Sequence, residues 1–261
     1  MRSASVGQQC VDCVGQGARD TRQARTAFGG RPVSGAVVTW TLVAINVAVF
    51  LVAWVRPGII NNLEMLGYYA PYGAGGPRQG VAAGEWYRLI TSAFVVPGAG
   101  LGGLGFVDIL FNMWALIFVG PALEGFLGRM RFLAVYLLSA VGGSVMYYFL
   151  APADHPAAGA SAAIYGLFGA WFVVARRLRL DSRGIVVLIA INLALSFWFR
   201  TSIAWQAHIG GLLAGALLTA AYVYAPRKNR AIWQALATIA VLAVLVIAVL
   251  VRNGQLTGAG L

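Results

Sequence analysis

The strongest pattern along the chain is a series of long apolar segments separated by short polar ones. A membrane-spanning helix needs about 20 predominantly apolar residues. The apolar segments reach or approach this length, although the fifth is short and the second contains Asp108 and Asn112. We therefore predict seven transmembrane helices, at approximately residues 36–55, 105–122, 132–150, 159–175, 184–199, 203–225 and 231–251.

The composition supports an all-α membrane protein in contact with a lipid bilayer. Hydrophobic residues make up 60% of the 261 residues and charged residues only 10%, whereas soluble domains are about 45–50% apolar. The net charge of +11 is compatible with a nucleic-acid partner. However, the basic residues lie between the apolar segments and do not form one stripe or patch, so we expect no nucleic-acid binding.

The Lys and Arg residues also predict the orientation of the helices. Cytoplasmic loops of membrane proteins carry an excess of these residues. Alternating the seven segments across the membrane places 14 of the 19 basic residues on the side of the N-terminus and five on the other side. We therefore expect a multi-pass protein of the cell membrane, with its N-terminus in the cytoplasm and its C-terminus outside.

Residues 1–35 are polar and lack the pattern of a signal peptide, so we expect a cytoplasmic tail. Cys10 and Cys13 have the CxxC spacing of zinc or redox pairs. Two thiolates are half of a zinc site, and the only histidines, His155 and His208, lie in the membrane part. We expect no bound metal here. The predicted division is a tail (1–35), a six-helix core (36–225), and a seventh helix with a short outer tail (226–261).

Three polar residues fall at similar depths within the apolar segments. With a rise of about 1.5 Å per residue, Asn112 lies about 10 Å, Ser161 a few Å and His208 about 8 Å below the outer surface. Polar groups are costly in hydrocarbon and mark functional sites in membrane helices. A hydroxyl and an imidazole at one depth suggest hydrolytic chemistry.

Small residues would allow the helices that carry Ser161 and His208 to approach closely. Glycine and alanine at three- and four-residue spacing let helix backbones pack together in membranes. Ordinary helix packing is the alternative explanation for this pattern. The small residues concerned are Gly159, Ala163, Gly166 and Gly169 in one segment, and Gly211 and Gly215 in the other.

Five motifs in a fixed order resemble the rhomboid family of intramembrane serine proteases, over about residues 36–225. They are GASAAIYG at 159–166, AHIGGLLAG at 207–215, DILFN at 108–112, Glu85-Trp86-Tyr87-Arg88 with Thr91 and Phe94, and GPALEGFLGRMRF at 120–132. The resemblance implies a rhomboid-like six-helix bundle with one added C-terminal transmembrane helix. It implies no cofactor, and substrates that are membrane proteins with a transmembrane helix. Their identity and the oligomeric state stay open.

The resemblance also implies roles for single residues. Ser161 would be the nucleophile and His208 the general base of a dyad without an acidic third member. Tyr165 would pack against the imidazole, and Gly159 and Gly211 would support the site. The Ser161 backbone amide and the Asn112 side chain would stabilise the oxyanion.

The chain departs from the family pattern in the same region. Asp108 stands where the family usually has a histidine, and an ionised carboxylate cannot donate a hydrogen bond to an oxyanion. Ala162 replaces a glycine after the nucleophile, and a glycine-rich insertion, Gly98 to Gly105, follows Val96, where a histidine often stands. The tail from Cys10 to Thr26 resembles the end of a zinc-binding segment of actinobacterial-type relatives.

Two classes of function therefore remain after the sequence is read. The first is an intramembrane serine endopeptidase. The second, suggested by Asp108, is a catalytically weak or inactive rhomboid-like protein that binds transmembrane helices. A transporter is a distant third possibility, because no inverted repeat or paired broken helices are evident.

Overall fold

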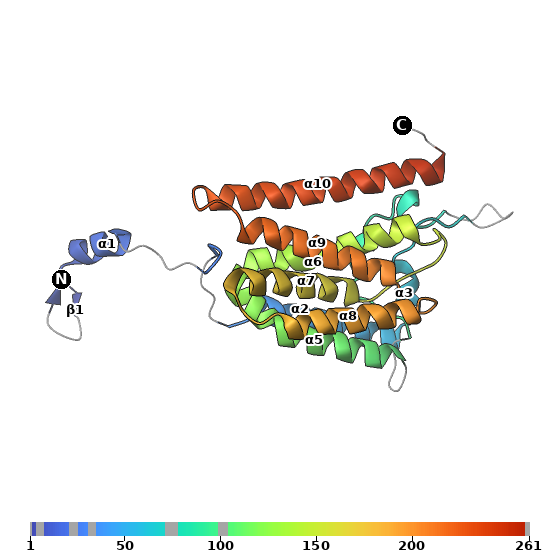
Figure 1. The fold of residues 1–261 in the computed structure, drawn as a ribbon, viewed down its shortest axis with the longest axis horizontal. Coiled ribbons are helices and arrows are strands. Elements are labelled where there is room, and N and C mark those ends of the chain that lie inside the picture. Colours follow the sequence, from blue (N-terminus) through green and yellow to red (C-terminus); the bar gives the residue numbers. More distant parts are fainter. Residues whose placement is uncertain are drawn as a thin grey trace.

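A computed structural model describes residues 2–3, 8–20, 26–30, 35–70, 78–98 and 104–258. Its body is a bundle of long helices, which confirms the predicted all-α fold (Figure 1). A two-residue antiparallel pair, β1 (Arg2–Ser3) and β2 (Gln8–Gln9), is the only sheet in the described part of the chain. The long helices are α2 (Val37–Val55), α5 (Leu104–Leu127), α6 (Arg129–Leu150), α7 (Ser161–Leu178), α8 (Arg183–Trp198), α9 (Trp205–Val223) and α10 (Arg230–Thr257).

Four short helices complete the described secondary structure. The polar tail contains α1 (Val11–Asp20), a helix that the apolar pattern did not predict. Between α2 and α5 lie α3 (Gly58–Leu63), the 3₁₀ turn η1 (Val81–Ala83) and α4 (Arg88–Thr91). Residues 99–103 of the predicted glycine-rich insertion lie outside the described residues, as do 21–25 and 31–34 of the tail.

The centre of the bundle is formed by α6, α7 and α9, and α10 lies at its periphery (Figure 1). Within the most apolar window of each helix, 61% of α6 but only 11% of α10 is buried by the rest of the protein. The exposed side chains of α10 are large and apolar, as expected for a helix whose surface contacts lipid. We therefore expect the functional site among the central helices α6, α7 and α9.

Within the described residues, five helices are long and apolar enough to cross a membrane: α2, α5, α6, α9 and α10. The chain is thus a multi-pass membrane protein. The predicted segments at 159–175 and 184–199 are also helices, but α8 has only 16 residues and α7 carries polar groups. Because α7 is surrounded by other helices, its residues need not be uniformly apolar to be stable there.

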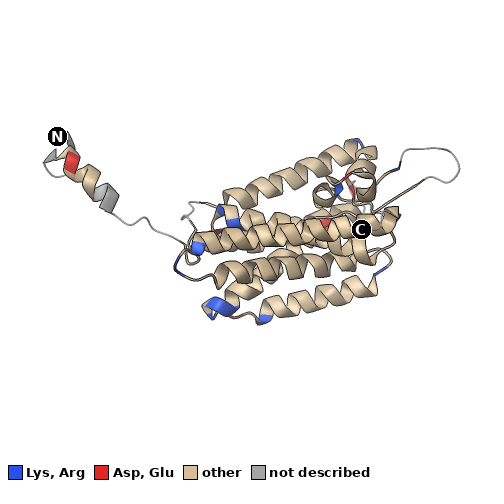
Figure 2. Ribbon diagram, turned by 90° about the horizontal axis from the view of Figure 1, so that it is seen from above, with Lys and Arg blue, Asp and Glu red and all other residues tan. Residues whose placement is uncertain are grey.

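The two ends of the bundle differ in charge (Figure 2). We call the end at which α7 and α9 begin the Ser161 end, and the opposite end the basic end. Among the residues that the structure describes, nine Lys and Arg residues lie in or beside the connections at the basic end, against five at the Ser161 end. Those at the basic end are Arg129, Arg131, Arg176, Arg177, Arg179, Arg183, Arg227, Lys228 and Arg230.

Arg88 holds together the connection between α2 and α5 at the Ser161 end. Its side chain is only 1% exposed and its Nε lies 2.8 Å from Glu85 Oε2. Its Nη1 donates to the carbonyl oxygens of Asn61 and Glu64, at 2.8 and 2.9 Å. A buried guanidinium with these partners is well satisfied, and it fixes the backbone of the loop against α4.

Glu124 performs a similar structural task at the basic end. It is fully buried in α5 and accepts hydrogen bonds from the backbone N–H groups of Val38 and Thr39, at 3.0 and 2.9 Å. A carboxylate at the first turn of a helix satisfies free N–H groups and interacts favourably with the helix dipole. Glu124 therefore joins α5 to the beginning of α2.

Candidate active site

Ser161 is the first residue of α7 and follows a tight backbone turn. Gly159 has φ +140°, a conformation that side-chain-bearing residues rarely adopt, and its N–H donates to the Ser92 carbonyl at 2.9 Å. The turn places the Ser161 hydroxyl at the helix N-terminus, where the first backbone N–H groups have no acceptor within the helix. This is a favourable position for binding a negative charge.

His208 lies in the first turn of α9, and its ring meets the Ser161 side chain. The distance from Ser161 Oγ to His208 Nε2 is 2.8 Å, although the two residues are 47 positions apart in the sequence. The imidazole is 6% exposed. The fold thus brings an alcohol oxygen and a ring nitrogen within the range required for proton transfer.

Tyr165 packs on the face of the His208 ring. One helical turn separates it from Ser161, so both side chains project toward α9. The two rings are stacked, with centroids 4.2 Å apart and planes inclined by 13°. The stacking limits rotation and tilting of the imidazole relative to Ser161.

Ser196 of α8 contacts the other nitrogen of the imidazole. Its Oγ lies 2.8 Å from His208 Nδ1 and donates to the carbonyl of Asn192 at 2.7 Å. The bond to a carbonyl of its own helix is the ordinary behaviour of a serine in a membrane helix. The sequence does not predict the contact of Ser196 with His208. Only the position of Ser196, near the end of an apolar helix and level with His208, distinguishes it from other serines.

Close contact between α7 and α9 makes this geometry possible. A Cβ atom at Gly211 would collide with the carbonyl oxygen of Ala162, and one at Gly215 with the backbone of Gly166. Of the small residues predicted to permit close approach, Gly166, Gly169, Gly211 and Gly215 lie in this contact, whereas Gly159 lies in the turn before α7.

Asp108 and Asn112 of α5 form a pair beside Ser161. Asn112 Nδ2 donates to Asp108 Oδ1 at 3.0 Å. A Cβ atom placed on Gly159 would be 3.4 Å from Ser161 Oγ and 3.8 Å from Asp108 Oδ2, so both oxygens face the same small space. Among the described residues Asn112 makes no hydrogen bond to Ser161; its partner is Asp108.

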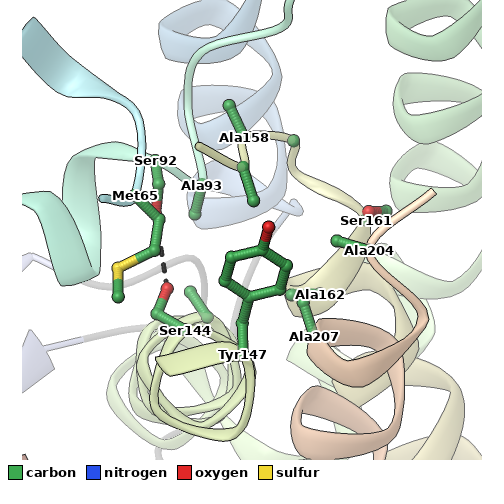
Figure 3. A pocket seen from close by; sticks show the side chains of 13 residues that line it. Met65, Ser92, Ala93, Ser144, Tyr147, Ala158, Ser161, Ala162, Ala204 and Ala207 are labelled. Carbon is green, nitrogen blue, oxygen red and sulfur yellow. Dashed lines mark hydrogen bonds between the residues drawn. The ribbon is translucent and has the colours of Figure 1, made fainter. Parts of the chain in front are cut away.

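A small cavity adjoins Ser161 (Figure 3). Its volume of about 30 Å³ is enough to hold water. Tyr147 projects from α6 into it, between Ser161 and the pair formed by Ser92 and Ser144, whose hydroxyl oxygens lie 3.3 Å apart. These hydroxyl groups offer hydrogen-bond partners to water beside the Ser161 side chain.

The cysteine pair of the tail lies outside this site. Cys10 and Cys13 are both exposed and unpaired. Backbone N–H groups of Cys13 and Asp12 lower the pKa of the Cys10 thiol. No group of three or more His, Cys, Asp or Glu side chains in the described part of the chain is arranged to hold a metal ion.

The fold and the site define a multi-pass helical membrane protein with a hydrogen-bonded serine–histidine pair at one end of its bundle. A family model described as Rhomboid domain matches residues 83–225, more than half of the chain. The chain therefore belongs to the rhomboid family.

Curated relatives are named as rhomboid proteases. The chain is 40% identical over 156 residues to "Putative rhomboid protease YdcA" of Bacillus subtilis, covering 58% of this chain and 73% of that protein. It is 32% identical over 187 residues to rhomboid protease GluP of the same organism, covering 70% of this chain but 34% of GluP. Rhomboid protease AarA of Providencia stuartii is 26% identical over 222 residues, which cover 74% of this chain and 75% of AarA.

Proposed function

We propose that this protein is an intramembrane serine endopeptidase that hydrolyses peptide bonds in or near the transmembrane helices of other membrane proteins. The observation that carries the proposal is the 2.8 Å contact between Ser161 Oγ and His208 Nε2. Family membership supports a protease in general, and this contact supports nucleophilic catalysis by Ser161 in this chain.

The reaction begins when Ser161 Oγ attacks the carbonyl carbon of the substrate peptide bond. The hydroxyl proton passes to His208 Nε2, which makes the ring an imidazolium. The imidazolium then gives this proton to the leaving amine, the C–N bond breaks, and an acyl ester remains on Ser161. Water attacks the ester with His208 again as the base, and the Ser161 hydroxyl is restored.

The negative oxygen formed in each step needs hydrogen-bond donors aimed at it. The Ser161 N–H at the start of α7 is the first donor, aided by the helix dipole. Asn112 is the second. Its amide carries two hydrogens, and the bond to Asp108 uses one of them, so the other is available for the oxyanion.

The site opens toward the exterior in this proposal. The greater number of basic residues at the basic end favours placing that end in the cytoplasm, together with the tail of residues 1–35. The C-terminus and the Ser161 end then face outside, where water reaches the cavity beside Ser161. Residues 36–225 would form the catalytic core, and residues 226–261 the added helix and outer tail.

A panel of reporter proteins, each with a different transmembrane segment, tests the proposal. Purified protein should cleave one or more reporters, and Ser161→Ala should abolish cleavage of all of them. Ser202→Ala is a matched control, because Ser202 is an exposed serine in the connection between α8 and α9. Equal cleavage by the wild type and Ser161→Ala would refute the proposal.

A second function, binding transmembrane helices without cleaving them, is favoured by one observation. The Asp108 carboxylate shares the space beside Ser161 and engages Asn112, so it opposes the development of negative charge there. A folded wild-type chain that co-purifies with a reporter and leaves it intact would support this alternative.

A further inference from the structure

His208 is held by two side chains besides Ser161, and they come from two helices. Tyr165 of α7 stacks on its face, and Ser196 of α8 contacts Nδ1 in the plane of the ring. Ser196 is 3% exposed and is one of only two residues that α8 buries, the other being Ile185. Of the two buried residues of α8, Ser196 is thus the one whose hydroxyl group contacts the imidazole.

The hydrogen atoms around Ser196 decide the role of each nitrogen of the ring. A serine hydroxyl has one hydrogen, and the Asn192 carbonyl oxygen, 2.7 Å from Ser196 Oγ, can only accept. When Ser196 donates to Asn192, it must accept a hydrogen from His208 Nδ1, 2.8 Å away. The proton of the neutral ring then lies on Nδ1, and Nε2 carries the lone pair that faces Ser161.

Tyr165 adds a further contact to the same hydroxyl. Its phenol oxygen lies 3.2 Å from Ser196 Oγ. Because the Ser196 hydrogen is used by Asn192, the Tyr165 O–H is the donor in this contact. Ser196 thus donates once and accepts twice, which saturates a hydroxyl group and fixes its orientation.

We propose that Ser196, with the Asn192 carbonyl behind it, is the positioning residue that sets the tautomer and the ring orientation of His208. The opposite tautomer would place a hydrogen on Nε2, where it could not take the proton of Ser161. In serine hydrolases with a third acidic member, that carboxylate performs this task, and the wrong tautomer slows the reaction by about 10⁴. Here a neutral hydroxyl and a backbone carbonyl perform it.

Nitrogen-15 NMR of histidine-labelled protein in detergent tests the tautomer directly. The chain has only two histidines, and His155 is exposed in a loop, so His155→Gln leaves His208 as the single imidazole signal. We expect a protonated Nδ1 and an unprotonated Nε2 in this background. Adding Ser196→Ala should shift the population toward the Nε2–H form, and Ser196→Thr, which keeps a hydroxyl, should preserve the Nδ1–H form. A wild-type ring with its proton on Nε2, or an unchanged ring in Ser196→Ala, would overturn the proposal.

Enzyme kinetics test whether the positioning of His208 by Ser196 affects the rate of cleavage, an effect that rests on the proposed protease function. Ser196→Ala should lower kcat for a reporter about 10- to 100-fold with KM little changed, because the ring loses its orientation and not its contact with substrate. Ser196→Thr should recover most of kcat. Ser139→Ala is the matched control: Ser139 is a fully buried serine of α6 whose hydroxyl has no hydrogen-bond partner among the described residues.

The outcomes separate the two proposals. Equal losses in Ser196→Ala and Ser139→Ala, with equal losses of thermal stability, would mean that Ser196 is merely structural. Failure of Ser196→Thr to recover kcat or the Nδ1–H form would also contradict the positioning role. A wild type that cleaves no reporter would refute the protease function, while the NMR result would still decide the role of Ser196.

Discussion

Asn112 donates one of its two side-chain amide hydrogens to Asp108, with Nδ2 and Oδ1 3.0 Å apart, on the helix that flanks Ser161. Asn112, which the family resemblance assigns to oxyanion stabilisation, is therefore hydrogen-bonded to a carboxylate. That carboxylate is Asp108, and rhomboid proteins usually have a histidine at its position. Asp108 Oδ2 and Ser161 Oγ also both lie within 4 Å of the position that a Cβ atom on Gly159 would occupy. A negative charge here would repel the oxyanion of the reaction, so we expect Asp108 to limit the rate.

Removing the charge of Asp108 should accelerate the chemical step. We expect Asp108→Asn and Asp108→His to increase kcat about 10- to 100-fold, since one oxyanion donor is worth about 10² to 10³ in other hydrolases. The increase should be measured with a cleaved reporter or by the rate of active-site labelling. Asp154→Asn, at an exposed loop acid, should leave the rate unchanged. A decrease in both Asp108 variants would show that the carboxylate assists the reaction.

Substitutions of Tyr165 should separate the two contacts of this side chain. Tyr165→Phe keeps the ring stacked on His208 and removes only the hydroxyl contact with Ser196, so we expect a loss of a few-fold in kcat. Tyr165→Ala removes the stacking as well, and its loss should be about tenfold or more. If the two variants lose activity equally, the stacked ring does not hold the imidazole.

Gly215 should be intolerant of even one added methyl group. A Cβ atom there meets the Gly166 backbone, so Gly215→Ala must push α9 away from α7. We expect a loss of about 1–3 kcal/mol in the free energy of unfolding, together with loss of activity. The control is Gly125→Ala in α5, where a Cβ atom has no neighbour within 4 Å. Equal stability of both variants in thermal unfolding would contradict the tight contact between α7 and α9.

The loop held by Arg88 should weaken in acid. Burial acts to raise the pKa of Glu85, but the Gly80 N–H and the Arg88 guanidinium outweigh it, and the pKa lies below the ordinary value of 4.5. Stabilisation by ionised Glu85 is therefore complete above 4.5 and is lost as the pH falls through the lowered pKa. Thermal unfolding midpoints from neutral pH downward should show this loss in the wild type. Glu85→Gln should be less stable at neutral pH and should lack this part of the pH dependence; a wild-type curve identical to that of Glu85→Gln would refute the role of the pair.

The apolar pattern predicted the seven long helices but not where they end. The second was expected to stop at 122, near Pro121, yet α5 continues to Leu127, and the last was expected at 231–251, whereas α10 extends to Thr257. Hydrophobicity marks the part of a helix that lies in hydrocarbon. Backbone hydrogen bonds carry the helix further, through polar residues that the pattern excludes.

The sequence predicts those residues of the candidate site that differ visibly from their apolar surroundings. Ser161 and His208 stand out as polar groups beside small residues, and the structure places their side chains in contact. Ser196 does not stand out, because a serine bonded to its own helix looks the same in sequence whether or not an imidazole lies beyond it. The Asp108–Asn112 bond was missed although the two residues are four positions apart, the spacing at which helical side chains meet.

The most direct measurement of the central claim is labelling by a fluorophosphonate in detergent, with the modified residue identified by peptide mass spectrometry. We expect a single adduct on Ser161 in the wild type, because His208 removes the hydroxyl proton as the oxygen attacks phosphorus and displaces fluoride. His208→Ala, shown to be folded by its thermal unfolding midpoint, should give no adduct. Labelling of Ser161 at the wild-type rate in His208→Ala would contradict the account.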